Sequence, residues 1–263
     1  MSSIQIILIT ANKERKETML RQFKELDLYF FCQIHILDAS TPDNSQDYLP
    51  KDETDYRKIR QLCCSKSHIR AIDFASLESS ADYSIIMEDD AAIDQVHFVK
   101  GVTEIVERWD DIIPKNCHMV SIGWNPFKNY KELSDMPFKR TLEYNPNTKI
   151  MEWFACGAQS YIIKKTSAKQ FTPLLNHSTF HQLYETITNL NGTFIPKGNT
   201  IYVCDEWLNR LLVQTLVFPL LVIEQKNIRS TIEPCGGLWH TDLWDKHFKG
   251  YETEMKRYWS YSE

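Results

Sequence analysis

Three consecutive carboxylates, Glu88-Asp89-Asp90, follow the apolar run 83–87. The run has the length and composition of a buried β-strand, and open α/β sheets bind ligands at the carboxyl ends of their strands. Clustered carboxylates repel one another unless a cation offsets their charge. A hard divalent ion such as Mn²⁺ or Mg²⁺, bridging the phosphates of a ligand, is a suitable counterpart. The alternative is a solvated acidic turn in which Asp90 or Asp94 caps the next helix.

The elements that position this cluster alternate between strand and helix over the first part of the chain. This alternation predicts an α/β fold with a mostly parallel sheet and helices on both faces. No internal repeat or linker divides the sequence, so we expect a single domain. The predicted strands are 4–10, 33–37, 83–87, 118–122 and 159–163, and the predicted helices are 13–26, 56–77, 98–109, 167–175 and 206–214.

The composition is that of a folded protein. The chain has 263 residues, of which 43% are hydrophobic and 25% charged, which argues against disorder. Its 30 Lys and Arg against 35 Asp and Glu give a net charge of −5, so nucleic acid is not an expected partner. The aromatic content of 12% suits sugar stacking, although core packing is its commoner role.

Neither an export signal nor a membrane anchor is predicted. The first apolar run, 4–9, is shorter than a signal sequence, and the longest, 215–223, is broken by Pro219. We therefore expect a cytoplasmic protein without a transmembrane segment. The seven cysteines show no spacing typical of a zinc site, which favours buried thiols in a reducing compartment.

Further motifs surround the acidic cluster. They are Cys64-Ser-Lys-Ser67-His68, Cys156-Gly157-Ala158, Asp205-Glu206-Trp207-Leu208, Phe218-Pro219-Leu-Leu-Val-Ile-Glu-Gln225 and Ser230-Thr-Ile232. In order and spacing, from Ile6 to Ile232, they resemble glycosyltransferase family 25, which contains lipooligosaccharide and collagen β-galactosyltransferases. The chain departs from the family at Cys63, where the family usually has Gly. It also departs at Asp38-Ala-Ser-Thr, where the family usually has Asp-Gly.

The resemblance implies a GT-A fold, with a Rossmann-like, mostly parallel mixed sheet flanked by helices. A single domain would span residues 1–263, with a nucleotide-sugar-binding half at about 1–125 and an acceptor-binding half at about 126–263. The implied activity is metal-dependent, inverting transfer of galactose or glucose from a UDP-sugar to a hydroxyl of a glycan or hydroxylated protein. Mn²⁺ or Mg²⁺ is the implied cofactor.

The family pattern also implies roles for the acidic cluster. Asp90 would be the direct metal ligand, while Asp89 and Glu88 would contact the ribose or orient the ligand, with Asp89 a second metal-site residue. His240, after two glycines near the end of the sequence, is a further candidate metal ligand; the alternative is an exposed tail histidine.

Residues after the first two strands would meet the donor. Thr10, Asn12 and Arg15 lie where GT-A enzymes bind the nucleoside and its phosphates, and Arg15 offers a bidentate donor to phosphate. Asp38 could accept a hydrogen bond from uracil or ribose. The alternatives are a solvated helix residue for Arg15 and a loop cap for Asp38.

Two other pairs are site candidates. Ser67 and His68 would face the ligand, although a helix histidine is more often structural, and Ser67 could act only as a cap. Gly157 and Ala158 would let the backbone approach a sugar closely, or simply allow a tight strand entry.

The predicted catalytic base is Asp205, with Glu206 second. Inverting displacement needs one carboxylate to take the proton of the acceptor hydroxyl. Asp205 follows the strand-like run 200–204 and begins a predicted helix, so helix capping is the alternative role.

Two other functions are compatible with an acidic cluster of this kind. The first is a degenerate family member that binds sugars or partners without catalysis, against which the intact acidic cluster and Asp205 argue. The second is a two-metal phosphodiesterase or nuclease, which requires a second acid/His cluster and a basic groove; neither is evident in the sequence.

Overall fold

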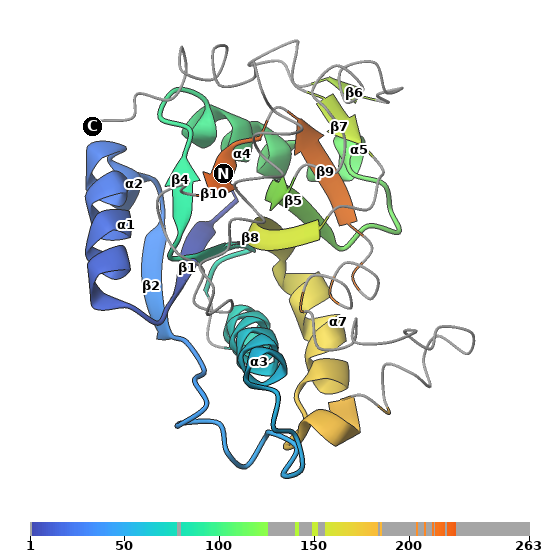
Figure 1. Ribbon diagram of the computed structural model, residues 1–263. Helices are drawn as coiled ribbons and strands as arrows, with labels where there is room; N and C mark the ends of the chain where they lie inside the picture. Colours follow the sequence, from blue (N-terminus) through green and yellow to red (C-terminus); the bar gives the residue numbers. More distant parts are fainter. Residues whose placement is uncertain are drawn as a thin grey trace.

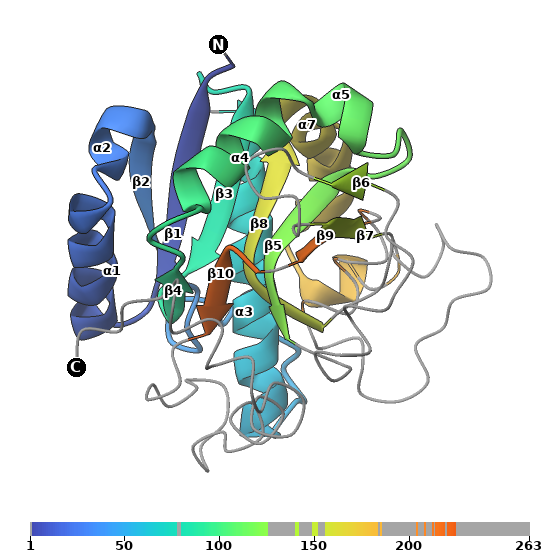
Figure 2. The same cartoon turned by 90° about the horizontal axis from the view of Figure 1, so that it is seen from above.

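The computed structural model describes residues 2–77, 80–125, 140–141, 149–151, 156–183, 185, 204, 208, 212, 214–218 and 220–224. In these residues, helices cover both faces of a mixed sheet with strand order β2-β1-β3-β8-β5-β9-β7-β6, and β10 pairs with β4 (Figures 1 and 2). The strands are β1 (Ile4–Thr10), β2 (Gln33–Asp38), β3 (Tyr83–Glu88), β4 (Ala91–Ile93), β5 (Met119–Asn125), β6 (Arg140–Thr141), β7 (Lys149–Met151), β8 (Cys156–Lys164), β9 (Gln214–Phe218) and β10 (Val222–Glu224). The helices are α1 (Lys13–Glu25), α2 (Leu28–Phe31), α3 (Tyr56–Leu77), α4 (Phe98–Glu107), α5 (Trp109–Ile112) and α7 (Lys165–Leu175).

Strand β1 shows how the core forms on both sides of the sheet. Successive strand side chains point to opposite faces. Ile6 and Leu8 accordingly pack with residues of α1, α2, α4 and α5, while Ile7 and Ile9 pack with residues of α3 and α7. All four side chains are buried. A strand that is buried on both faces has a continuous apolar sequence rather than an alternating one, which is why β1 and β3 were recognisable.

The three N-terminal strands end at the same edge of the sheet. β1 pairs in parallel with both β2 and β3, in a register that sets Thr10 opposite Asp38 and Ile9 opposite Glu88. The segments that follow these strands therefore lie near one another, together with α3, whose apolar side packs on the sheet. This edge positions the candidate site.

The predicted α/β fold is confirmed, with corrections to individual elements. β8 lies antiparallel between β3 and β5, so the parallel pattern of the N-terminal half does not continue through the sheet. Cys204, predicted at the end of a strand, has a helical backbone. Gln214, predicted to end a helix, begins β9. The short strands β4 and β10 were not predicted, because three residues carry too little periodicity to be recognised.

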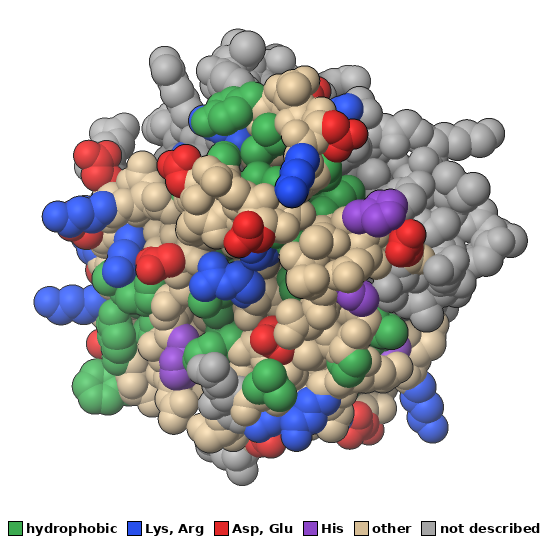
Figure 3. All heavy atoms as spheres, turned by 90° about the horizontal axis from the view of Figure 1, so that it is seen from below, with side chains coloured by type: hydrophobic (Ala, Val, Ile, Leu, Met, Phe, Trp, Pro, Cys, Tyr) green, Lys and Arg blue, Asp and Glu red, His purple; other side chains and the backbone are tan. Residues whose placement is uncertain are grey.

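Figure 3 shows the charged side chains on one face of the molecule. On the face shown in Figure 3, basic and acidic side chains are interspersed, and the described residues of that face show no continuous basic patch. Within the described part of the chain, no helix is both long enough and apolar enough to cross a bilayer.

Candidate functional site

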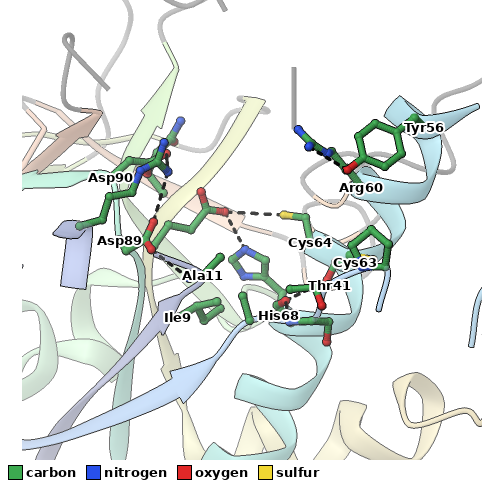
Figure 4. Close-up of a pocket in the computed structure, with 17 residues that line it drawn as sticks. Ile9, Ala11, Thr41, Tyr56, Arg60, Cys63, Cys64, His68, Asp89 and Asp90 are labelled. Atoms are coloured by element: carbon green, nitrogen blue, oxygen red, sulfur yellow. Dashed lines mark hydrogen bonds and ion pairs between the residues drawn. The ribbon is translucent and has the colours of Figure 1, made fainter. Parts of the chain in front are cut away.

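A cavity of about 260 Å³ lies at the edge where β1, β2 and β3 end (Figure 4). Asp89 and Asp90 form one wall, and α3 carries Tyr56 and Arg60 on another. Ligands of open α/β sheets bind at this position, outside the carboxyl ends of parallel strands. The lining residues are Ile9, Ala11, Arg15, Ala39, Ser40, Thr41, Pro42, Tyr56, Arg60, Cys63, Cys64, Ser67, His68, Glu88, Asp89, Asp90 and Gln159.

Asp89 is a buried carboxylate that joins the ends of β1 and β3. Its Oδ2 accepts hydrogen bonds from the Thr10 hydroxyl at 2.8 Å and from the Ala11 amide at 3.0 Å. Its Oδ1 lies 3.4 Å from Nη1 of Arg15. Both oxygens have protein partners, which gives Asp89 a positioning role where β1 and β3 end.

Arg15 supplies positive charge beside the acidic cluster. Its Nη1 lies 3.8 Å from Oδ2 of Asp90 as well as close to Asp89, and its side chain is only 10% exposed. A guanidinium in this position offsets the repulsion between the two carboxylates. Asn12 accepts hydrogen bonds from the Glu14 and Arg15 amides and caps α1, so it helps to place Arg15 and is not among the cavity-lining residues.

Glu88 points away from the two aspartates and toward α3. Its Oε1 lies 2.8 Å from Nε2 of His68 and 3.9 Å from the Cys64 sulfur. His68 is fully buried, and its Nδ1 lies 3.1 Å from the Tyr161 hydroxyl. Burial alone would lower the pKa of His68, but hydrogen bonds with Cys64 and Glu88 outweigh burial and raise it to about 10. Glu88 and Cys64 therefore favour the protonated form of His68, which offsets the charge of Glu88.

Ser67 fixes the segment after β2 against α3. Its hydroxyl donates to the Cys63 carbonyl at 2.8 Å and accepts from the Ser40 amide at 2.8 Å. The Ser40 side chain, only 7% exposed, lines the cavity, and its hydroxyl has no hydrogen-bond partner within the described structure. A buried hydroxyl in this position is available to a bound molecule.

Sequence reasoning missed Tyr56, Arg60 and Gln159 as lining residues. Tyr56 and Arg60 are one turn apart at the start of α3, with Nη2 of Arg60 2.9 Å from the Tyr56 hydroxyl and the guanidinium 4.3 Å from the ring centroid. Their helical spacing shows that they share a face, but the sequence does not show what that face covers. Gln159 lies on β8, whose antiparallel pairing with β3 brings it to the cavity.

Six of the predicted site residues line the cavity: Arg15, Ser67, His68, Glu88, Asp89 and Asp90. Thr10 contacts the site through Asp89. The exposed Asp38 side chain is not part of the lining, and its carbonyl accepts from Arg70 at 2.9 Å. Gly157, at a φ of 95°, and Ala158 lead into Gln159 without lining the cavity themselves.

The remaining predicted residues, Asp205, Glu206 and His240, lie outside the described part of the chain. Among the predicted metal-site residues, Asp89 and Asp90 both line the cavity and carry the oxygen donors that a hard divalent ion prefers. The described residues also bring Cys64, His68 and Cys204 together, although their sequence spacing gave no indication of a metal site.

A family model matches most of the chain. The model of glycosyltransferase family 25, described as an LPS biosynthesis protein, matches residues 1–184, which include every cavity-lining residue. No curated protein matches the sequence.

Several solved structures are similar at low identity. A glycosyltransferase involved in glycosylation of the major capsid of PBCV-1 has a TM-score of 0.39 and 12% identity, with coverage of 94% of this chain and 98% of that one. The galactosyltransferase LgtC, in complex with donor and acceptor sugar analogues, has a TM-score of 0.42 and 10% identity, with coverage of 92% and 96%. A197 from STIV has a TM-score of 0.37 and 12% identity, with coverage of 81% of each chain.

Proposed function

The chain belongs to glycosyltransferase family 25, and from this premise we propose that it transfers a hexose, galactose or glucose, from a UDP-sugar to a hydroxyl group of a glycan or hydroxylated protein. The chain is a transferase with a GT-A fold, its mixed sheet flanked by helices on both faces. The donor, the stereochemistry and the metal requirement are the parts that we propose.

One observation carries the proposal: the family-matched region has a cavity at the ends of its parallel strands that combines cationic and acidic side chains. Arg15 and Arg60 are suited to the diphosphate of a nucleotide-sugar, because a guanidinium donates to phosphate in a planar fork. Asp90 is the carboxylate suited to a divalent ion. Asp89, held by Thr10 and Ala11, keeps Arg15 in place beside Asp90.

A divalent ion such as Mn²⁺ would be held by Asp90 together with donor phosphates, with His240 as a proposed additional ligand. Bound there, the ion would neutralise charge on the departing diphosphate. Glu88 is oriented toward His68 instead, so we assign it to shaping the donor pocket. Asn12 caps α1 and so helps to position Arg15. Ser67 accepts a hydrogen bond from the Ser40 amide and so positions the segment after β2.

Inverting transfer would require one basic side chain on the acceptor side. The acceptor oxygen forms a bond to the anomeric carbon while the bond from that carbon to the diphosphate breaks, and the hydroxyl proton passes to the base. We assign Asp205 as this base and Glu206 as its substitute. Support comes from the family motif and from Cys204, which adjoins Asp205 in sequence and packs in the same core cluster as α3.

A donor screen tests the proposal. UDP-Gal, UDP-Glc, UDP-GlcNAc, UDP-Xyl and CMP-sialic acid are each incubated with the protein, with and without Mn²⁺, and nucleotide release is measured. We expect release from a UDP-hexose that depends on Mn²⁺, and a product of inverted anomeric configuration by NMR once an acceptor is found. Mn²⁺-coupled UDP binding without turnover across a donor and acceptor panel would instead indicate a binding module.

A further inference from the structure

Two residues of α3 and one from the C-terminal part of the chain form a cluster of soft donor atoms. Cys64 and His68 are four residues apart in α3, so their side chains lie on the same side of the helix. Cys204 is buried in the core cluster that α3 helps to form. The donor atoms of the three residues lie within 4.8 Å of one another, and neither cysteine forms a disulfide.

The donor set is one that Zn²⁺ prefers. Two thiolates and an imidazole are typical zinc ligands, with Zn–S distances of about 2.3 Å and Zn–N distances of about 2.0 Å. Tetrahedral coordination at these lengths separates the ligand atoms by roughly 3.3–3.8 Å. A grouping within 4.8 Å therefore needs only small side-chain adjustments to surround an ion.

The surroundings of His68 support this role. Zinc-bound histidines usually direct their second nitrogen to a hydrogen-bond acceptor that fixes the ring. The Tyr161 hydroxyl, 3.1 Å from Nδ1, is placed to accept this hydrogen bond, and the metal would take the place of the Nε2 proton that now faces Oε1 of Glu88. Oε1 of Glu88, 2.8 Å from Nε2 and 3.9 Å from the Cys64 sulfur, is an oxygen positioned beside the donor atoms.

We propose that Cys64, His68 and Cys204 bind one Zn²⁺ ion, with the Glu88 carboxylate beside its fourth coordination position. Binding replaces the thiol protons of both cysteines and the Nε2 proton of His68, and all three protons pass to solvent. The ion joins α3 to the chain segment immediately before Asp205. The site differs from the proposed Mn²⁺ site, because Asp90 offers hard oxygen donors and this cluster offers sulfur and nitrogen. The proposal does not depend on sugar transfer.

Metal analysis of the untagged, reduced protein tests the site. We expect about one Zn²⁺ per chain after gel filtration, and replacement by Co²⁺ should give the intense absorption of cobalt–thiolate bonds. Cys64→Ser and Cys204→Ser should each lose the bound zinc and this absorption. Cys63→Ser is the matched control, because Cys63 neighbours Cys64 on α3 but hydrogen-bonds with Ser45, and it should bind the metal as the wild type does.

A second measurement uses the wild-type protein alone, in case a variant fails to fold. Added Zn²⁺ should slow iodoacetamide labelling of Cys64 and Cys204 by at least about tenfold, because a metal-bound thiolate is withdrawn from reaction. Labelling of Cys32 and Cys63, measured by mass spectrometry in the same samples, should not change. Equal labelling rates with and without Zn²⁺ would overturn the proposal, as would full metal binding by the Cys64→Ser and Cys204→Ser variants.

Discussion

The hydroxyl of Thr10 donates a 2.8 Å hydrogen bond to Oδ2 of Asp89, a residue 79 positions away in the sequence. This contact joins the carboxyl ends of β1 and β3 and, through the other oxygen of Asp89, fixes Arg15. The two ends of the bond are the last residue of one strand and the first residue after another. Asp89 therefore holds the ends of the two strands together, and both Asp89 and Asp90 line the cavity.

The first prediction concerns this contact. Asp89→Asn should lower the free energy of unfolding by about 1–3 kcal/mol, because the buried Arg15 loses a charged partner. Urea unfolding monitored by circular dichroism measures the change. Asp47→Asn, at an exposed loop carboxylate that does not line the cavity, should leave the urea midpoint unchanged. Equal midpoints for the two variants would contradict the role given to Asp89.

The second prediction concerns phosphate recognition by α3. Arg60→Ala should weaken UDP binding roughly 10- to 100-fold, the effect of losing one charge-assisted hydrogen bond. Arg57→Ala is its control, because Arg57 is an exposed residue of the same helical turn outside the cavity lining. Isothermal titration calorimetry in the presence of Mn²⁺ measures both affinities. If both variants bind UDP like the wild type, Arg60 does not contact the nucleotide.

The third prediction concerns the packing of β5 against β10. A Cβ atom at Gly123 would lie 3.0 Å from Cβ and 3.1 Å from the carbonyl oxygen of Val222. Gly123→Ala should therefore destabilise the protein by about 1–3 kcal/mol through overpacking. Adding Val222→Gly removes the Cβ and Cγ1 contacts of the clash, so the double variant should lose less stability than the sum of the two single changes. Strict additivity in urea unfolding would show that the two sites are not in contact.

The fourth prediction concerns pH. Partial burial lowers the pKa of His118, whose ring lies 4.8 Å from that of Phe171. The unfolded chain then binds more protons than the folded one between the lowered pKa and the usual value of about 6.5. The stabilising contribution of this histidine is present above a pH of about 6.5 and is lost as the pH falls from there through the lowered pKa of the folded state.

The comparison of wild type with His118→Gln isolates this contribution. Thermal midpoints measured between pH 5 and pH 7.5 should fall more steeply toward low pH in the wild type than in the variant. The difference cancels the effects of other titrating groups, including His68. Parallel curves would mean that His118 has the same pKa in the folded and unfolded states.

The sequence predicted the parallel half of the fold well, because β1 and β3 are buried on both faces and their apolar runs are unbroken. The antiparallel position of β8 was not predictable, since the apolar pattern of a strand does not encode its direction. The same limit applied at the site. Glu88, Asp89 and Asp90 were recognisable as a cluster, but the divergence of their side chains toward His68, Arg15 and the cavity depends on contacts between distant segments.

Residues with ordinary sequence surroundings were the hardest to identify. Tyr56 and Arg60 begin the predicted helix 56–77 without belonging to a motif, and Ser40 lies between predicted elements, so only the fold places all three at the cavity. Cys204 lies at the end of an apolar run, so its approach to Cys64 and His68 depends on tertiary packing alone. The assignments of Asp205, Glu206 and His240 remain predictions from the family motif.

The central claim is that the cavity beside Asp90 binds a UDP-sugar for transfer, and donor hydrolysis by matched variants tests it most directly. Release of UDP from the preferred UDP-hexose is measured with Mn²⁺ for the wild type, Asp90→Asn and Asp47→Asn. We expect Asp90→Asn to lose at least about 100-fold in rate while keeping the wild-type melting temperature, and Asp47→Asn to remain fully active. If the wild type hydrolyses the donor and Asp90→Asn does so at the same rate, Asp90 has no role in donor hydrolysis and the proposed site is wrong.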